Sequence, residues 1–266
     1  MASGGYICWL EETPSQWKKW VDHLTTKFEP LWRKVGIIEA IITSTFNIRK
    51  DFNLVLNLAE RWNLSTNTFV FPWGEATVTL EDMIILGGYS CVNGYGLVSP
   101  LLPVTDNLKQ IEKSIKEEDP KEQGDVNFKG VIHDCVFPIA VRLARGMRFA
   151  FAPAVLASIY RDLSKLKNAI VACNDFMPGE CKSKRKLEVT LYSPIQLVQL
   201  WAWEGFLDLE AIPASVSFGE PRAARWDNVK FHKLDNVRVA LDCAKNSFRW
   251  RPYAISVSNW EFPKFY

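Results

Sequence analysis

The sequence lacks the clusters of residues that usually hold a structural metal ion. It has only three histidines, and its six cysteines include no CxxC pair, whereas zinc sites are typically built from closely spaced pairs of such ligands. No metal site is therefore expected. We interpret the dispersed cysteines as small, reduced, buried side chains; they are Cys8, Cys91, Cys135, Cys173, Cys181 and Cys243.

Long apolar runs are also missing. No stretch of about eighteen apolar residues occurs without a charge, although a helix needs about that length to cross a bilayer. The first residues do not combine a basic start with an apolar run, as a secretory signal would. The chain is expected neither to enter the secretory route nor to associate with a membrane.

An excess of charge of either sign is absent. The 32 basic residues nearly balance the 30 acidic ones, which gives a formal net charge of +2. Any nucleic-acid contact is therefore expected to be local, since generic affinity requires a positive field over the whole molecule. The one dense basic cluster, KSKRK, offers Lys182, Lys184, Arg185 and Lys186 for nuclear import or for phosphate contacts, and a solvated loop is the simpler interpretation.

Complete catalytic motifs are lacking as well. The glycine-rich segment 87–96 does not carry the Lys-Ser or Lys-Thr pair of a phosphate loop. His133, Asp134 and Cys135 are adjacent, so they cannot face one another as a base and a nucleophile. We interpret these three residues as the start of a helix.

Aromatic residues are abundant, with eleven Trp and sixteen Phe, so the core is expected to consist largely of rings. Apolar residues recur at helical spacing through most of the chain. The expected helices begin near Ser15, after Gly36, at caps on Asp51 and Thr79, before a break at Gly146, again near Pro153, at Pro194, and at a cap on Asp235.

Strand patterns are short. TNTFVFPWGEATVTL alternates apolar and polar residues around a Pro72-Trp73-Gly74 corner and predicts a β-hairpin, and a short strand is expected just before Pro194. Between residues 94 and 129 a helix is expected, followed by a polar acidic stretch, interrupted by Pro120 and Gly124, that is expected to be a mobile loop. These patterns predict a mainly α fold, a single globular multi-helix domain over residues 1–266 with a β-hairpin and a few short strands.

Two carboxylates lie among apolar neighbours. Glu75 follows the tight corner at Trp73, and Glu204 lies in the apolar helix that also carries Trp201 and Trp203. A buried carboxylate requires a partner, so we expect both glutamates to form structural ion pairs. We expect all five residues to organise the fold or to contribute to an interaction surface.

Three arginines could supply those partners. Arg142, Arg145 and Arg148 recur at spacings of three, which places them on one side of a helix. Guanidinium is the favoured buried cation, so a buried Arg–Glu network is expected. An anion or nucleic-acid site is the alternative.

Three separated segments resemble one family in the expected order. TNTFVFPWGEATVTLEDMIILGGYS, VFPIAVRLARGMRFAFAPAVLASIYRDL and IQLVQLWAWEGF closely resemble the plant mobile domain, also labelled the aminotransferase-like plant mobile domain. The resemblance covers about residues 32–266. From the resemblance we expect two departures: a stretch before VFPIAVRLARG that is shorter than in the family, and the lack of the family's C-terminal continuation after EFPKFY.

The resemblance implies a domain of plant transposable elements and of nuclear proteins that act in meristem maintenance, gene expression and transposon silencing. It implies a nuclear location and a nuclear protein partner, with a phosphatase-like protein among the candidates. The aminotransferase label would require a Schiff-base lysine and a phosphate cup. Lys165 and Lys167 have no such cup beside them, so no cofactor and no enzymatic activity are expected.

Three hypotheses follow. The first is a non-catalytic protein-interaction module, indicated by the aromatic content and by the family resemblance. The second is a nucleic-acid-binding domain of transposon origin that uses the KSKRK cluster and the three arginines. The third is a degenerate enzyme that uses Glu75 or Glu204.

Overall fold

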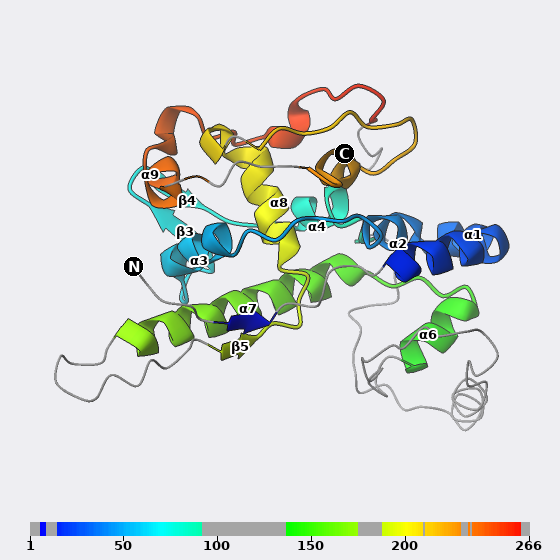
Figure 1. Ribbon diagram of the computed structural model, residues 1–266. Helices are drawn as coiled ribbons and strands as arrows, with labels where there is room; N and C mark the ends of the chain where they lie inside the picture. The colour runs from blue at the N-terminus through cyan, green and yellow to red at the C-terminus, as the bar shows by residue number, and fades with distance from the viewer. Residues whose placement is uncertain are drawn as a thin grey trace.

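The computed structural model describes residues 6–8, 15–91, 137–174, 188–209, 211–229, 234 and 236–261. This part of the chain is mainly α-helical with short strands, as the sequence predicts (Figure 1). Its α-helices are α1 (Ser15–Val35), α2 (Ile38–Thr43), α3 (Phe52–Arg61), α4 (Leu80–Ile85), α6 (Phe137–Ala144), α7 (Phe151–Asn174), α8 (Gln196–Gly205) and α9 (Val237–Asp242). Its 3-10 helices are η2 (Leu207–Leu209), η3 (Arg222–Trp226), η4 (Ala244–Asn246) and η5 (Pro252–Ala254).

Several sequence predictions lie outside the described residues. They concern the helix and the polar loop expected within residues 94–129, the His133-Asp134-Cys135 segment and the KSKRK cluster.

Local capping signals set the boundaries of the N-terminal helices. α1 begins at Ser15 itself and is followed by Gly36, whose φ of +75° turns the chain into α2. Asp51 caps α3, since its Oδ1 accepts a hydrogen bond from the Leu54 N–H at 3.0 Å. Thr79 and Asp82 form the predicted capping box at the start of α4.

The predicted hairpin is present and gains a third strand. β2 (Trp62–Asn63), β3 (Thr68–Phe71) and β4 (Gly74–Ala76) form an antiparallel sheet in the order β2-β3-β4. Phe69 and Phe71 point into the core while Val70 between them is exposed, as strand alternation requires. A second sheet pairs β1 (Tyr6–Cys8) with β5 (Glu188–Thr190) in parallel, so it joins segments about 180 residues apart along the chain.

The end of α4 lies directly against α2. Gly88 has a φ of +68°, and a Cβ at this position would lie 2.5 Å from the carbonyl carbon of Glu39. Only glycine permits both the conformation and this close approach. Gly88 therefore brings α2 and α4 together at the site described below.

α7 is the long helix that runs below α3, α4 and α8 in the view of Figure 1. It follows the predicted break at Gly146 (φ +82°) and carries Pro153 in its first turn. Asp162 in α7 is buried, and its Oδ2 accepts the N–H groups of Tyr192 and Ser193 at 2.8 Å each. Burial alone would raise the pKa of Asp162, but these backbone donors lower it below its usual value. α7 thereby anchors the turn that leads into α8.

α8 runs through the middle of the fold, and every residue from Leu197 to Gly205 is buried (Figure 1). It begins at Gln196, two residues after the predicted start at Pro194.

The cap of α9 also differs from the prediction, by one residue. Asn236, not Asp235, caps this helix, because Asn236 has the non-helical backbone (φ −139°, ψ 77°) and accepts from the Val239 N–H.

Rings pack along the edge of the core next to the hairpin. Trp73 is half-buried, stacks on Phe71 at a centroid distance of 4.8 Å, and packs against Phe248 at 4.9 Å. Its indole N–H donates to the Leu241 carbonyl at 2.9 Å. Trp73 therefore ties the hairpin to α9.

The expectation of buried cysteines is wrong where it can be examined. Cys173 and Cys243 are exposed, and Cys91 is half-buried. Cys173 lies in the last turn of α7 and Cys243 is the C-cap of α9, so both occupy helix ends at the surface.

Among the helices of the described ranges, none is long and apolar enough to cross a membrane.

We expect Trp73→Ala to lower the free energy of unfolding by about 3 kcal/mol, because it removes a packed ring and leaves the Leu241 carbonyl without its donor. Trp250, in the same cluster, is 63% exposed, so Trp250→Ala should cost about 1 kcal/mol or less. Denaturant titrations of the two variants test this. Equal losses would contradict the assigned packing of Trp73.

Candidate functional site

Glu204 lies at the centre of a buried polar network. Its carboxylate is 2% exposed and pairs with the side chain of Arg222, which is 1% exposed. Arg222 donates from Nη2 to Oε2 at 2.8 Å and from Nε to Oε1 at 3.2 Å. Arg225 Nη1 and Trp226 Nε1 also donate to Glu204, at 3.2 Å and 2.9 Å. The carboxylate is therefore fully satisfied by neighbours in η3.

The network extends through Arg222 to the C-terminal segment and to α4. The Arg222 guanidinium lies over the rings of Tyr253 and Trp260, at 5.2 Å and 4.8 Å, and donates to the Pro252 carbonyl at 3.0 Å. The Tyr253 hydroxyl donates in turn to Asp82. One connected set of buried groups thus joins α4, α8, η3 and η5.

The prediction that Arg142, Arg145 and Arg148 pair with the two glutamates is wrong. α6 ends at Ala144 and Gly146 has a positive φ, so Arg145 and Arg148 lie beyond the helix and do not share a face with Arg142. No ion pair between these arginines and Glu75 or Glu204 occurs in the described part of the chain.

The arginines that do pair with Glu204 were not predicted, although their spacing in the sequence is regular. Arg222 and Arg225 are three residues apart, and residues i and i+3 lie on one side of a 3-10 helix. Once the 3-10 helix is known, this spacing places both guanidinium groups on one face of η3, but it does not identify Glu204 as their partner.

Glu75 is exposed, contrary to the expectation of partial burial. It pairs across the sheet with Val70, on the outer face opposite to Phe69 and Phe71. Its Oε2 accepts from the Thr68 hydroxyl at 2.7 Å.

The two predicted tryptophans of α8 are both buried. Trp201 stacks on Phe69 at 5.2 Å, and Trp203 packs against Trp226 at 5.3 Å. They thus lie on the hairpin side and the η3 side of α8, and Trp203 belongs to the surroundings of Glu204.

Two hollows meet over α2 and α4. The first has a volume of about 340 Å³ and the second about 240 Å³, and both are lined by Glu39 and Ile84. We call them together the α2–α4 groove. Its lining residues are Arg33, Gly36, Ile38, Glu39, Ile84, Gly88, Tyr89, Ser90, Cys91 and Arg148 in the first hollow, joined in the second by Ile85, Phe218, Gly219, Glu220, Pro221, Arg222, Asn259, Trp260 and Glu261.

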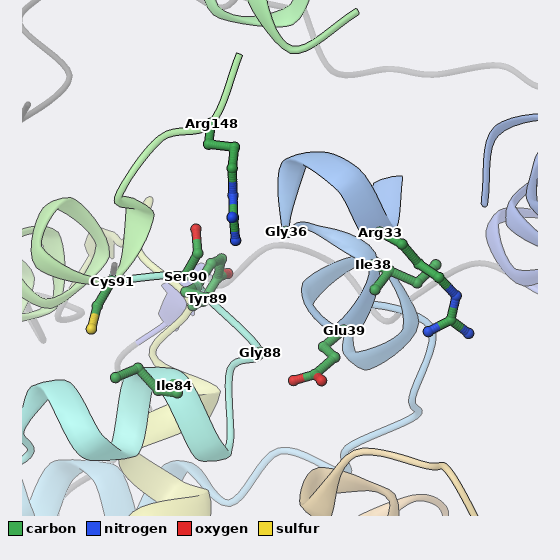
Figure 2. A pocket seen from close by; sticks show the side chains of 10 residues that line it. All are labelled: Arg33, Gly36, Ile38, Glu39, Ile84, Gly88, Tyr89, Ser90, Cys91 and Arg148. Atoms are coloured by element: carbon green, nitrogen blue, oxygen red, sulfur yellow. The ribbon is translucent and has the colours of Figure 1, made fainter. Parts of the chain in front are cut away.

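The first hollow brings together segments distant in sequence (Figure 2). Arg148 extends from the α6–α7 connection toward Gly36, where a Cβ would lie 3.4 Å from its Nη2. Ser90 fixes the neighbouring wall, since its hydroxyl donates to the Phe149 carbonyl at 2.6 Å and its carbonyl accepts from Ala152 at 3.1 Å. This end of the groove therefore has a firm backbone and a guanidinium at its rim.

Charge changes sign along the groove. Arg33 and Arg148 lie at the first hollow, whereas Glu220 and Glu261 lie at the second, with Glu39 where the two meet. Burial raises the pKa of the Glu39 carboxyl above its usual value, and the nearby Arg33 opposes this shift only in part. Apolar side chains line the space between these charges, so the groove combines an apolar surface with opposite charges at its ends.

Comparison with known proteins relates this fold to one family. The family described as "Plant mobile domain" matches residues 36–131 and 126–264. A similar protein is the "Serine/threonine-protein phosphatase 7 long form homolog" of Arabidopsis thaliana, 27% identical over 252 residues. The match covers 77% of this chain and only 18% of that relative. No solved structure matches.

We expect Glu204→Gln to lower the free energy of unfolding by about 3–5 kcal/mol, because it leaves the Arg222 guanidinium buried without its counter-charge. Glu75→Gln makes the same chemical change at an exposed position, so its cost should stay within about 0.5 kcal/mol. Urea titration of both variants measures the difference. A small, equal loss in the two would contradict the buried ion pair.

Asp82 should make stability depend on pH. Burial raises the pKa of its carboxyl to about 6, although hydrogen bonds from Tyr253 and Thr79 lower it, whereas the unfolded carboxyl titrates near 3.9. Between about pH 4 and pH 6, the folded state therefore keeps a proton on Asp82 that the unfolded chain has lost. The stabilisation from neutral Asp82 is fully present below about pH 4 and is lost as the pH rises through about 6.

Asp82→Asn tests this dependence, because the amide cannot titrate. The stability of the wild type relative to Asp82→Asn should fall by about 3 kcal/mol from pH 4 to pH 7 and then level off. Unfolding by denaturant across this pH range measures the difference in the free energy of unfolding between the two proteins. The protonation of all other groups is common to both proteins and cancels in this difference. A constant difference, or one that increases with pH, would contradict the assignment.

Proposed function

The chain belongs to the plant mobile domain family, and from that premise we propose that it is a non-catalytic protein-interaction module of a plant nuclear protein that acts in gene expression and transposon silencing. The α2–α4 groove is the observation that carries the proposal. A phosphatase-like nuclear protein is among the proposed partners.

The groove suits a short segment of a partner protein. Its two hollows, of about 340 and 240 Å³, meet at Ile84 and Glu39. They therefore form two neighbouring pockets, which could bind successive side chains of the segment. Protein interfaces commonly combine an apolar centre with a polar rim. Here the guanidinium groups of Arg33 and Arg148 and the carboxylates of Glu220 and Glu261 supply that rim, and they would set the direction in which the segment lies.

The positions of the two glutamates favour a binding role over the enzyme hypothesis. Glu204 is held by Arg222, Arg225 and Trp226 inside the core, while Glu75 lies on the outer face of the sheet. General acid–base catalysis needs such groups near a substrate. Neither glutamate lines the groove.

A nucleic-acid-binding domain is the less favoured proposal. The net charge is only +2, and Arg142, Arg145 and Arg148 do not form one basic helix face. Several phosphate contacts would be needed for strong binding.

Affinity purification from plant nuclear extract tests the proposal, with nuclease treatment and quantitative mass spectrometry. The baits are the wild type, Ile84→Lys and the matched variant Leu80→Lys, which places the same charge at an exposed position of α4 outside the groove. We expect a defined protein that survives nuclease on the wild type and on Leu80→Lys, and a loss of about tenfold or more on Ile84→Lys.

Two outcomes would count against the module. One is equal retention of every protein by all three baits. The other is retention only of chromatin or RNA proteins that nuclease releases, which would move nucleic-acid binding to first place. Denaturant titration of Ile84→Lys verifies that the variant is folded.

A further inference from the structure

Trp250 is a large ring that the fold presents to solvent. Its side chain is 63% exposed, yet it packs edge-on against Trp73 at 5.8 Å and against Phe248 at 5.0 Å, with interplanar angles of 87° and 89°. Phe248 in turn packs on Phe206 of the core at 4.7 Å. The exposed indole therefore rests on rings that are rooted in the interior.

The backbone beside Trp250 is also fixed. The Arg249 N–H donates to the Gly205 carbonyl at 2.8 Å, and Phe206 and Phe248 form a β-bridge. A Cβ at Gly205 would lie 2.8 Å from the Phe248 ring, so glycine allows this close approach to the end of α8. An exposed tryptophan on a fixed backbone loses little conformational freedom when it binds.

Two arginines, Arg249 and Arg251, flank Trp250 in the sequence. Arg249 and Arg222 both repel Arg225 and contribute to the lowered pKa of its guanidinium, after burial, while Glu204 opposes them. Glu204 already bonds to Arg222 and Arg225. In the part of the chain that the structure describes, no carboxylate forms an ion pair with Arg249 or with the exposed Arg251.

We infer that Trp250, Arg249 and Arg251 form a second interaction surface, and that its partner is an acidic protein segment in which carboxylates alternate with bulky apolar side chains. We call it the Trp250 surface. Carboxylates of the segment would supply the counter-charges that the two arginines lack, and an apolar side chain would cover the exposed indole. Tryptophan and arginine are the residues most enriched at the energetic centres of protein interfaces.

The Trp250 surface is distinct from the α2–α4 groove. None of its three residues lines the groove, and the hairpin and α9, to which Trp73 is tied, lie at the opposite end of the molecule from α1 and α2 (Figure 1). A protein segment is favoured over a nucleic acid because only two unpaired cations adjoin Trp250 in the described chain, whereas nucleic acid would need a longer run of phosphate contacts.

Binding of a synthetic probe tests the inference. The probe is a fluorescein-labelled peptide of about sixteen residues that alternates Glu and Leu, and its titration with the whole chain is followed by fluorescence anisotropy. We expect Trp250→Ala to weaken binding about tenfold or more, and Arg249→Gln with Arg251→Gln to weaken it and reduce its salt dependence.

Matched controls separate the surface from general effects. Tyr192→Ala removes a ring that is 64% exposed elsewhere, and Lys18→Gln with Lys19→Gln removes two exposed charges from α1. Both should leave the affinity within about twofold of the wild type, as surface changes away from a contact do. Ile84→Lys should bind the peptide as the wild type does, so failure of the groove proposal and failure of this one remain distinguishable.

The inference is overturned if the peptide does not bind at high concentration, or if Trp250→Ala and the double arginine variant bind it as well as the controls do. It is also overturned if an oligothymidine of similar length binds more tightly than the peptide and depends on the same three residues. In that case the surface takes single-stranded nucleic acid by stacking.

Discussion

The buried pair of Glu204 and Arg222 is the interaction on which the rest of the structure depends. Moving two charges out of water costs several kcal/mol each, and their attraction compensates only when every remaining donor and acceptor is satisfied. Arg225, Trp226, the Pro252 carbonyl and two aromatic rings meet that requirement. The segments that carry these groups must therefore occupy fixed positions around α8, and Tyr253 transmits the constraint to Asp82 and α4.

Elements whose signals are local could be predicted from the sequence. The caps at Asp51 and Thr79, the break at Gly146 and the proline in the first turn of α7 depend on residues within a few positions of one another. The hairpin was predicted for the same reason. The core helix α8 was recognised because it is apolar all round, although only the structure shows that Glu204 inside it is completely enclosed.

Features that depend on distant pairings could not be predicted in this way. Nothing in the neighbourhood of Glu204 indicates that its partners lie 18 and 21 residues later in a 3-10 helix. The outward position of Glu75 depends on strand register. The α2–α4 groove was missed entirely. Its walls come from α1, α2, α4, the α6–α7 connection, the segment 218–222 and the segment 259–261, and no periodicity links them.

The contact between Asp82 and Tyr253 spans 171 residues of sequence, and this separation matters while the chain is being synthesised. α4 leaves the ribosome long before Tyr253 exists, and residues Arg222 and Pro252 are made even later than α8. Domains fold as units once their contacts can form, so the nascent chain must carry an incomplete, aromatic-rich interior until the segment around Tyr253 has emerged. Transiently exposed apolar surface of this kind is prone to aggregation, whereas a helical bundle with neighbour-to-neighbour contacts would bury its rings earlier in synthesis.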